Sequence, residues 1–367
     1  MVLPEEILPW FGIDLILQGS YVMKMCKRIL YSLVLLSMIS ANCMGVPPWA
    51  PRFSPAAWGG HGVSPLQFSE SSSFGQQPAN TDAELKDLVD RAAFKVGEYI
   101  TRFKDLTAEE EQKVEEFDSE GKLKRQRRIA SDLVVYQSQL DPTKMVEYRD
   151  VKSVDGVPVK KREARLASLL NKSAQAGSVK KELERINRES RRYDLNYSIY
   201  GMTLNPGLPL HENARGSFQF KLAGREQVNG RDAVVIEYQQ VSQNPDIAFK
   251  LSSLPSELKG AWTLHRGRLW LDPETAQIRR EVREMTLEHP TLTRPLVMMR
   301  YDLDYANSRF GFFTPERIVI STYNHGRTGA DKKHELLLGG KVTFEYGAFT
   351  RFDVETPDAS VTPPAKP

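Results

Sequence analysis

The sequence predicts an α+β fold built on one large, curved antiparallel sheet. Segments with strand character follow one another through short turn signals such as Asp118–Gly121 and Asn229–Gly230, a pattern typical of hairpins. No alternation of strand, helix and strand is apparent, which argues against a parallel, Rossmann-like sheet. A long N-terminal helix and a helical insert between strands supply the α component.

The first part of the chain is expected to precede the folded body. Lys24, Lys27 and Arg28 stand before the apolar run Ile29–Ile39, and small residues follow. This order is typical of a secretory signal, which we place at 23–45. The sequence therefore predicts an exported protein that is periplasmic or associated with the cell envelope.

The segments around this signal have other roles. Residues 1–22 are interpreted as an upstream extension, 46–80 as a disordered linker rich in Pro, Gly and Ser, and 356–367 as a disordered tail. Lipid anchoring at Cys43 is the less favoured alternative to simple cleavage, because Asn42 replaces the small residue that a lipoprotein signal requires.

The body is expected to be a single domain over 81–355. It opens with a long amphipathic helix, because Thr81 and Glu84 have capping-box spacing and apolar residues follow at helical intervals up to Phe103. Strands are then expected at 109–117, 123–136, 151–154, 157–159, 216–222, 234–238, 267–271, 278–287, 297–305, 317–323 and 341–354.

Residues 159–193 are predicted to form a basic insert of two helices. They hold eleven Lys and Arg against four Glu, in a chain whose overall charge is only +3. Such helices suit an anionic membrane or a phosphorylated headgroup, and the candidate contacts are Arg185, Arg188, Arg191 and Arg192. The alternative is a solvated helix face. Nucleic acid is not favoured, because Tyr193 is the only aromatic residue of the insert.

In the predicted strand at 278–287, the apolar residues do not all fall on one face. Ile278 and Val282 fall on one face, and Met285 and Leu287 on the other. If all four point inward, a β-bulge is expected near Arg283 or Glu284. The charged residues from 279 to 284 are interpreted as cross-strand pairs on the outside of the sheet.

Several short motifs recur in a known group of proteins. They are Arg149–Val151 before Val154–Gly156, Arg188–Tyr193, Gly267–Thr275 and Tyr346–Phe352. Together with the order of elements, these motifs resemble uncharacterised secreted proteins of soil bacteria. The architecture of that group is similar to the periplasmic lipoprotein carrier LolA. The resemblance covers 81–355.

The resemblance implies an open half-barrel whose unclosed sheet has helices over its open side and an apolar space for acyl chains. The first helix and the insert at 159–193 would form the lid. Aromatic residues that recur through the body are candidates to line this cavity, with ordinary core packing as the alternative: Phe103, Phe218, Phe220, Trp262, Trp270, Tyr301 and Phe344.

Motifs for catalysis are not found. Both cysteines, Cys26 and Cys43, precede the body, which excludes a Cys nucleophile or a Cys-ligated metal within it. The six histidines show no metal-ligand spacing, and no GxSxG, GxGxxG or Walker A pattern occurs.

We therefore predict a non-enzymatic protein without cofactor that binds a lipid or a lipoprotein acyl chain. An envelope sensor or scaffold that binds a protein partner with a filled core is the alternative, and a hydrolase whose site forms only in three dimensions is a third. The oligomeric state is left open.

Overall fold

The computed structural model describes residues 79–138, 141, 145–162, 168, 179–195, 199, 201–249, 258–328 and 333–351. The segments predicted at 1–22, 23–45 and 356–367 lie outside the described residues, as do nearly all of the linker at 46–80 and most of the first half of the insert.

The predicted N-terminal helix is confirmed as α2, Ala79–Arg102. One face of α2 is buried in the core through Leu88, Ala92, Val96 and Tyr99, whereas Phe94 on the other face is 66% exposed. The other helical elements are α4 (Val179–Ser190), α5 (Glu212–Arg215) and the 3-10 turns η2 (Met202–Leu204) and η3 (Leu208–Leu210). No described helix is both long and apolar enough to cross a membrane.

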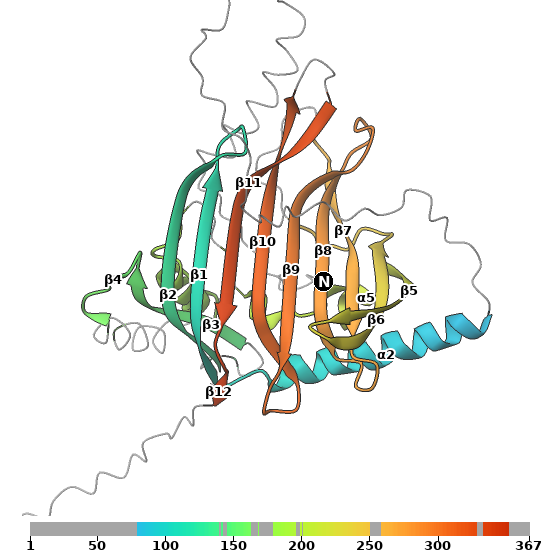
Figure 1. The fold of residues 1–367 in the computed structure, drawn as a ribbon, viewed down its shortest axis with the longest axis horizontal. Helices are drawn as coiled ribbons and strands as arrows, with labels where there is room; N and C mark the ends of the chain where they lie inside the picture. Colours follow the sequence, from blue (N-terminus) through green and yellow to red (C-terminus); the bar gives the residue numbers. More distant parts are fainter. Residues whose placement is uncertain are drawn as a thin grey trace, which may run out of the picture.

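The strands form one antiparallel sheet. They are β1 (Leu106–Phe117), β2 (Leu123–Gln137), β3 (Met145–Val154), β4 (Val157–Pro158), β5 (Phe218–Val228), β6 (Arg231–Gln240), β7 (Trp262–Leu271), β8 (Ile278–Glu288), β9 (Leu296–Asn307), β10 (Phe313–Thr328), β11 (Lys333–Tyr346) and β12 (Thr350–Arg351). Their order is β4-β3-β2-β1-β11-β10-β9-β8-β7-β6-β5, with β12 beside β1 (Figure 1). Within the described residues β4 and β5 do not pair, so the sheet is open, as predicted.

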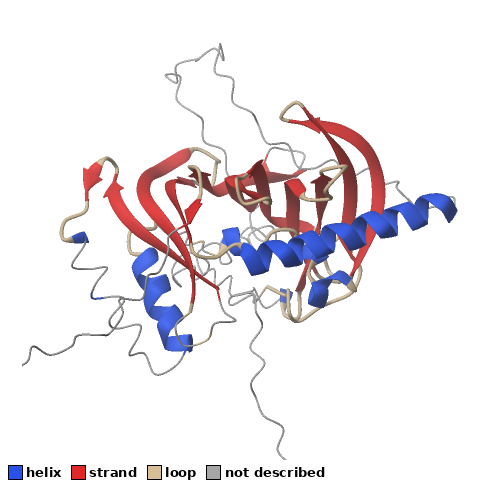
Figure 2. Ribbon diagram, turned by 90° about the horizontal axis from the view of Figure 1, so that it is seen from below, coloured by secondary structure: helices blue, strands red, loops and turns tan. Residues whose placement is uncertain are grey.

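The inner, concave face of this sheet is mostly apolar. Paired residues on neighbouring strands point to the same face, so the register defines rows of side chains across the sheet. One such row is Leu222, Ile236, Leu269, Glu281, Leu303, Ile318, Phe344, Gln112 and Ile129. The sheet arches over α2, which crosses beneath it (Figure 2), and together they enclose the main core.

Helix α4 packs on the other, outer face of the sheet at the β2–β3 end. Its Ile186 is buried with Val146 and Tyr148, whereas the next residue, Arg149, pairs in register with Leu133 of the main core. Because neighbouring residues of a strand face opposite ways, α4 lies outside the arch. This helix of the insert is therefore not part of a lid over the open side, as the resemblance implies. It covers apolar side chains on the outer face of β3 instead.

The outer face elsewhere carries charged cross-strand pairs. Arg266 contacts Glu284 at 2.9 Å, and Arg280 lies 3.6 Å from Asp304. These two pairs agree with the interpretation of 279–284. A small apolar cluster shares this face: Val228, Ala233, Val235, Trp270 and Val282.

The expected β-bulge lies elsewhere in β8. Leu271 pairs with Ile278 and Trp270 with Arg280, so Arg279 is the extra residue. The shift at Arg279 sends Glu281 and Arg283 to the inner face and Val282 to the outer one. The register with β9 also shifts between Met285 and Thr286, but the extra residue there is Met298 of β9. The expectation of a bulge of β8 near 283–284 and of outward Glu281 and Arg283 is therefore wrong.

Candidate functional site

The structure gathers five of the seven predicted aromatic residues in the main core. Phe103, Phe218, Tyr301 and Phe344 are buried there, and Phe220 packs against them while partly exposed. Trp270 instead belongs to the cluster on the outer face, and alternation along β7 puts the partly buried Trp262 on that same face. That these five aromatic residues line a ligand cavity stays a prediction.

Aromatic rings fill the space where α2 ends against the sheet. Phe103 stacks on Tyr99 with 4.6 Å between ring centroids, and the Phe349 ring lies edge-on 5.2 Å from Phe103. Phe312 meets Tyr99 edge-on at 5.7 Å. This packing fixes the C-terminal end of α2 against β1 and β12.

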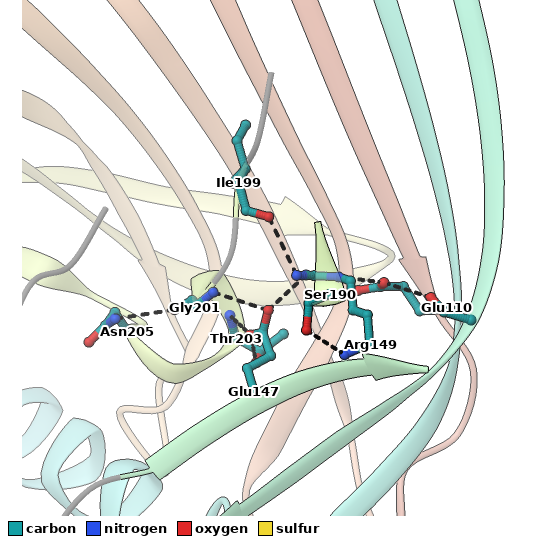
Figure 3. Close-up of polar contacts among 9 residues, drawn as sticks. Glu110, Glu147, Arg149, Ser190, Ile199, Gly201, Thr203 and Asn205 are labelled. Atoms are coloured by element: carbon teal, nitrogen blue, oxygen red, sulfur yellow. Dashed lines mark hydrogen bonds and ion pairs between the residues drawn. The ribbon is translucent and has the colours of Figure 1, made fainter. Parts of the chain in front are cut away.

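Three charged side chains are buried beneath the β1–β3 end of the sheet (Figure 3). The Arg149 Nε donates to Glu110 Oε1 at 2.6 Å, and Arg149 Nη2 lies 2.7 Å from Glu147 Oε1. Arg149 Nη1 donates to the carbonyl of Ile199 at 3.4 Å, and Ser131 donates to Glu110 at 3.1 Å. Charges this deeply buried persist because they are paired and hydrogen-bonded.

Burial and ion pairing shift the pKa values of Glu110 and Arg149 in opposite directions. Burial raises the pKa of the Glu110 carboxyl, although Arg149 beside it opposes the rise. For Arg149, burial alone would lower the pKa of the guanidinium, but Glu110 and Glu147 together raise it well above its usual value. Arg149 therefore stays charged and holds both carboxylates.

A second buried pair lies beneath β6–β8. Tyr238 donates its hydroxyl to Glu281 Oε1 at 3.0 Å, and Arg283 Nη1 lies 3.3 Å from the same oxygen. Gly267 separates Tyr238 from Arg283 in the register. A Cβ at Gly267 would come within 2.6 Å of the Tyr238 hydroxyl, so this glycine makes room for the tyrosine to cross β7.

One carboxylate from each buried cluster, Glu147 or Glu281, binds the same segment, the loop 201–211. Glu147 accepts hydrogen bonds from the backbone N–H of Gly201 at 3.0 Å and from the Thr203 hydroxyl at 2.6 Å. Glu281 accepts one from the N–H of Gly207 at 3.0 Å. Tyr99 of α2 donates to the carbonyl of Thr203 at 2.7 Å. Two distant strands thus hold this loop, and the loop in turn holds α2.

An open hollow of about 620 Å³ lies on the surface between the β3–β4 hairpin and the C-terminal end of α4. Its lining combines apolar and cationic residues: Val154, Val157, Pro158, Val159, Lys160, Lys161, Arg192 and Tyr193. A surface of this composition can hold an anionic group beside an apolar one.

The predicted basic residues lie at the C-terminal end of the insert. Arg185 and Arg188 lie in α4, whereas Arg191 and Arg192 follow its last residue. Arg192 borders the hollow, and Arg191 Nε donates to the Asn187 carbonyl at 3.2 Å. Their role in anion contact stays a prediction.

The arrangement provides apolar surfaces and cations. Within the described residues, no group of three or more His, Cys, Asp and Glu side chains could hold a metal ion. Sequence reasoning missed the buried charges, and it counted Lys160 and Lys161 among the basic residues of the insert without selecting them as contacts. The inward orientation of Glu110 could have been predicted. Glu110 continues the alternation of the inward residues Leu106 and Ala108 along the strand.

Comparisons with family models and with curated proteins find no match. Among solved structures, the chain is similar to a DUF1329 family protein from Desulfovibrio piger, with 12% identity over 75% of this chain and 95% of that one and a TM-score of 0.32. It is also similar to a domain described as an outer membrane lipoprotein-sorting protein from Vibrio parahaemolyticus, at 8% identity over 72% and 93% of the two chains (TM-score 0.29). A LolA superfamily protein from Nitrosomonas europaea matches at 9% identity over 74% and 94% of the two chains (TM-score 0.27).

These similarities concern architecture, and they include the LolA-like group that the sequence resembles. With identities of 8–12% and TM-scores of 0.27–0.32, they carry no argument for this chain. The argument for function therefore rests on the residues of this chain.

Proposed function

We propose that this chain is a non-enzymatic protein of the cell envelope that binds a lipid, or the acyl chain of a lipoprotein, on the concave face of its open sheet. The observation that carries the proposal is that the apolar concave surface continues to the edge strand β5. There Phe218, Phe220 and Leu222 occupy alternate positions that face inward, and Phe220 and Leu222 stay partly exposed.

An acyl chain suits this surface for a simple reason. It has no hydrogen-bonding groups to satisfy, and it gains about 25 cal/mol for each Å² of apolar area that leaves water. Phe249 packs against the same core and is also partly exposed. An aliphatic chain along β5 would cover these side chains and continue the core outward.

The cover of the concave face fits a binding protein as well. Helix α2 and the loop 201–211 lie against the apolar rows, and the polar contacts that tie the loop to the sheet converge on Glu147 and Glu281. Val96 of α2 and Leu208 and Leu210 of the loop are buried in the same core, so this cover packs directly on the apolar rows.

The test begins with the exported protein purified from its own envelope. Native mass spectrometry followed by organic extraction is expected to find lipid in stoichiometric amount. In a titration with a fluorescent fatty acid, Phe220→Asn with Leu222→Asn should weaken binding about tenfold, because about 1–2 kcal/mol of apolar contact is lost. Val241→Asn is the matched control, since Val241 is an exposed apolar residue just beyond β6.

The alternative, an envelope sensor or scaffold that binds a protein partner, has support from the aromatic packing. The rings of Tyr99, Phe103, Phe312 and Phe349 already occupy the space beside β1 and β12. A protein that carries no lipid from its envelope, and whose fatty-acid titration does not respond to the β5 variants, would favour this alternative.

A further inference from the structure

We infer that the hollow between the β3–β4 hairpin and the end of α4 is a docking site for the phosphate-bearing headgroups of an anionic membrane. This site lies outside the arch of the sheet, and its function does not depend on lipid binding at the concave face. The inference rests on four properties of the hollow: its charge, its apolar tip, its rigidity and its position.

The charge of the hollow is positive and largely uncompensated. Within the described part of the chain, Lys160 and Lys161 have no ion pair, and Arg192 has one long contact of 3.4 Å with Glu189. The cations of the outer sheet face differ, since they are matched by carboxylates, as in Arg266 with Glu284. A free cationic group attracts phosphate, and each such residue near an anionic surface contributes about fivefold to binding.

The hairpin adds an apolar tip to these cations. Val157 is 67% exposed, and Pro158 beside it is exposed as well. An exposed apolar tip with lysines next to it is typical of segments that enter the interface of a bilayer, where the apolar side chains meet acyl chains and the cations meet headgroups. An acidic protein would satisfy the cations but would leave Val157 without a comparable partner.

The site is held in place before any ligand arrives. The turn Asp155–Gly156 has positive φ at both residues, 51° and 79°, as a tight two-residue hairpin requires. The Asp155 carboxylate accepts the backbone N–H of Arg128 at 2.8 Å. On the other wall, Arg127 Nη1 donates to the Tyr193 carbonyl at 2.8 Å. Strand β2 therefore positions both walls of the hollow.

The residues after the lysines are also fixed. Arg162 forms ion pairs with Asp150, at 2.6 Å, and with Asp132. It ties the chain back to β2 and β3 immediately after Lys161, so the two exposed lysines lie between β4 and this anchor. Preorganised cations lose less entropy when they bind than flexible ones do.

Flotation of the full chain with vesicles tests the inference. The protein should bind vesicles of phosphatidylcholine with phosphatidylglycerol at low salt, bind vesicles of phosphatidylcholine alone weakly, and lose binding at high salt. Lys160→Gln with Lys161→Gln should reduce binding about 25-fold, from about fivefold for each charge. Val157→Asp should also weaken it.

The matched control removes two positive charges elsewhere. Arg225→Gln with Arg231→Gln alters two exposed arginines of the β5–β6 hairpin and should leave binding within about twofold of the unchanged protein. Unfolding midpoints measured by circular dichroism verify that all variants are folded.

Three outcomes would overturn the inference. The first is equal binding to the two kinds of vesicle, which would indicate uptake by an apolar surface. The second is unchanged binding by the Lys160 and Lys161 double variant. The third is loss of vesicle binding in millimolar inorganic phosphate at constant ionic strength, which would assign the site to a free anion.

Discussion

Glu281 accepts a hydrogen bond from the hydroxyl of Tyr238 at 3.0 Å, and the tyrosine reaches it by passing over Gly267. The second oxygen of Glu281 accepts the backbone N–H of Gly207. A side chain of β6 thus orients the carboxylate of β8 that holds the loop beneath the sheet. The attachment of α2 and the loop to the sheet therefore depends on Gly267, where a side chain would clash with Tyr238.

Gly267→Ala should destabilise the protein by about 1–3 kcal/mol. The new Cβ would lie 2.1 Å from the Val282 carbonyl oxygen and 2.6 Å from the Tyr238 hydroxyl, so β7 or Tyr238 must shift. Urea unfolding measures the change. Gly216→Ala is the control, because a Cβ there meets nothing within 4 Å. Equal stability of the two variants would contradict the role assigned to Gly267.

Arg149→Ala should cost about 3–5 kcal/mol of unfolding free energy, because it leaves Glu110 and Glu147 buried without their cation. Arg91→Ala provides the comparison: Arg91 contacts Asp87 at 2.9 Å, and both side chains are exposed, at 46% and 68%. Exposed pairs contribute at most about 1 kcal/mol. Similar losses in the two variants would show that the buried network does not hold the β1–β3 end.

Phe103→Asp should lower the unfolding free energy by at least about 3–5 kcal/mol, since it removes a buried ring and buries an unpaired charge. Phe94→Asp is matched in chemistry and lies within α2, where the ring of Phe94 is 66% exposed. That variant should stay within about 0.5 kcal/mol of the unchanged protein. Thermal unfolding of both variants checks which face of α2 is buried.

The elements of the fold were predictable because their signals are local. The spacing of apolar residues from Leu85 to Phe103 determines one face of a helix, and α2 ends one residue before Phe103. The turn at Asn229–Gly230 was predicted from the pair itself, and both residues have the positive φ that the turn needs.

The buried charges were harder to predict. The bulge that turns Glu281 and Arg283 inward occurs at Arg279, where neither Gly nor Pro marks it. The hollow could not be predicted either. Lys160 and Arg192 are far apart in sequence, and they line the same hollow only because strand β2 holds both of its walls. Trp270 was assigned to a cavity from its residue type, whereas alternation from Leu269 determines its face.

The pH dependence of stability should show the contribution of His211. Burial, together with the positive charge of Arg283, lowers the pKa of His211 to about 4, although the Pro206 carbonyl opposes the shift. The unfolded state has a pKa near 6.5 and therefore binds a proton first as the pH falls. The contribution of His211 is then fully present above pH 6.5 and is lost between about pH 6.5 and pH 4.

The size of this loss follows from the difference between the two pKa values. At about 1.4 kcal/mol per unit, it is on the order of 3 kcal/mol. His211→Gln keeps an amide donor toward the Pro206 carbonyl but cannot take up a proton, so its stability should fall less steeply over this window. Urea unfolding from pH 7 to pH 4 measures both curves, and His289→Gln, at a partly exposed position, is the control. If the His211→Gln curve runs parallel to that of the unchanged protein, His211 is not the group that titrates, and His265, whose pKa burial lowers to about 3, becomes the next residue to replace.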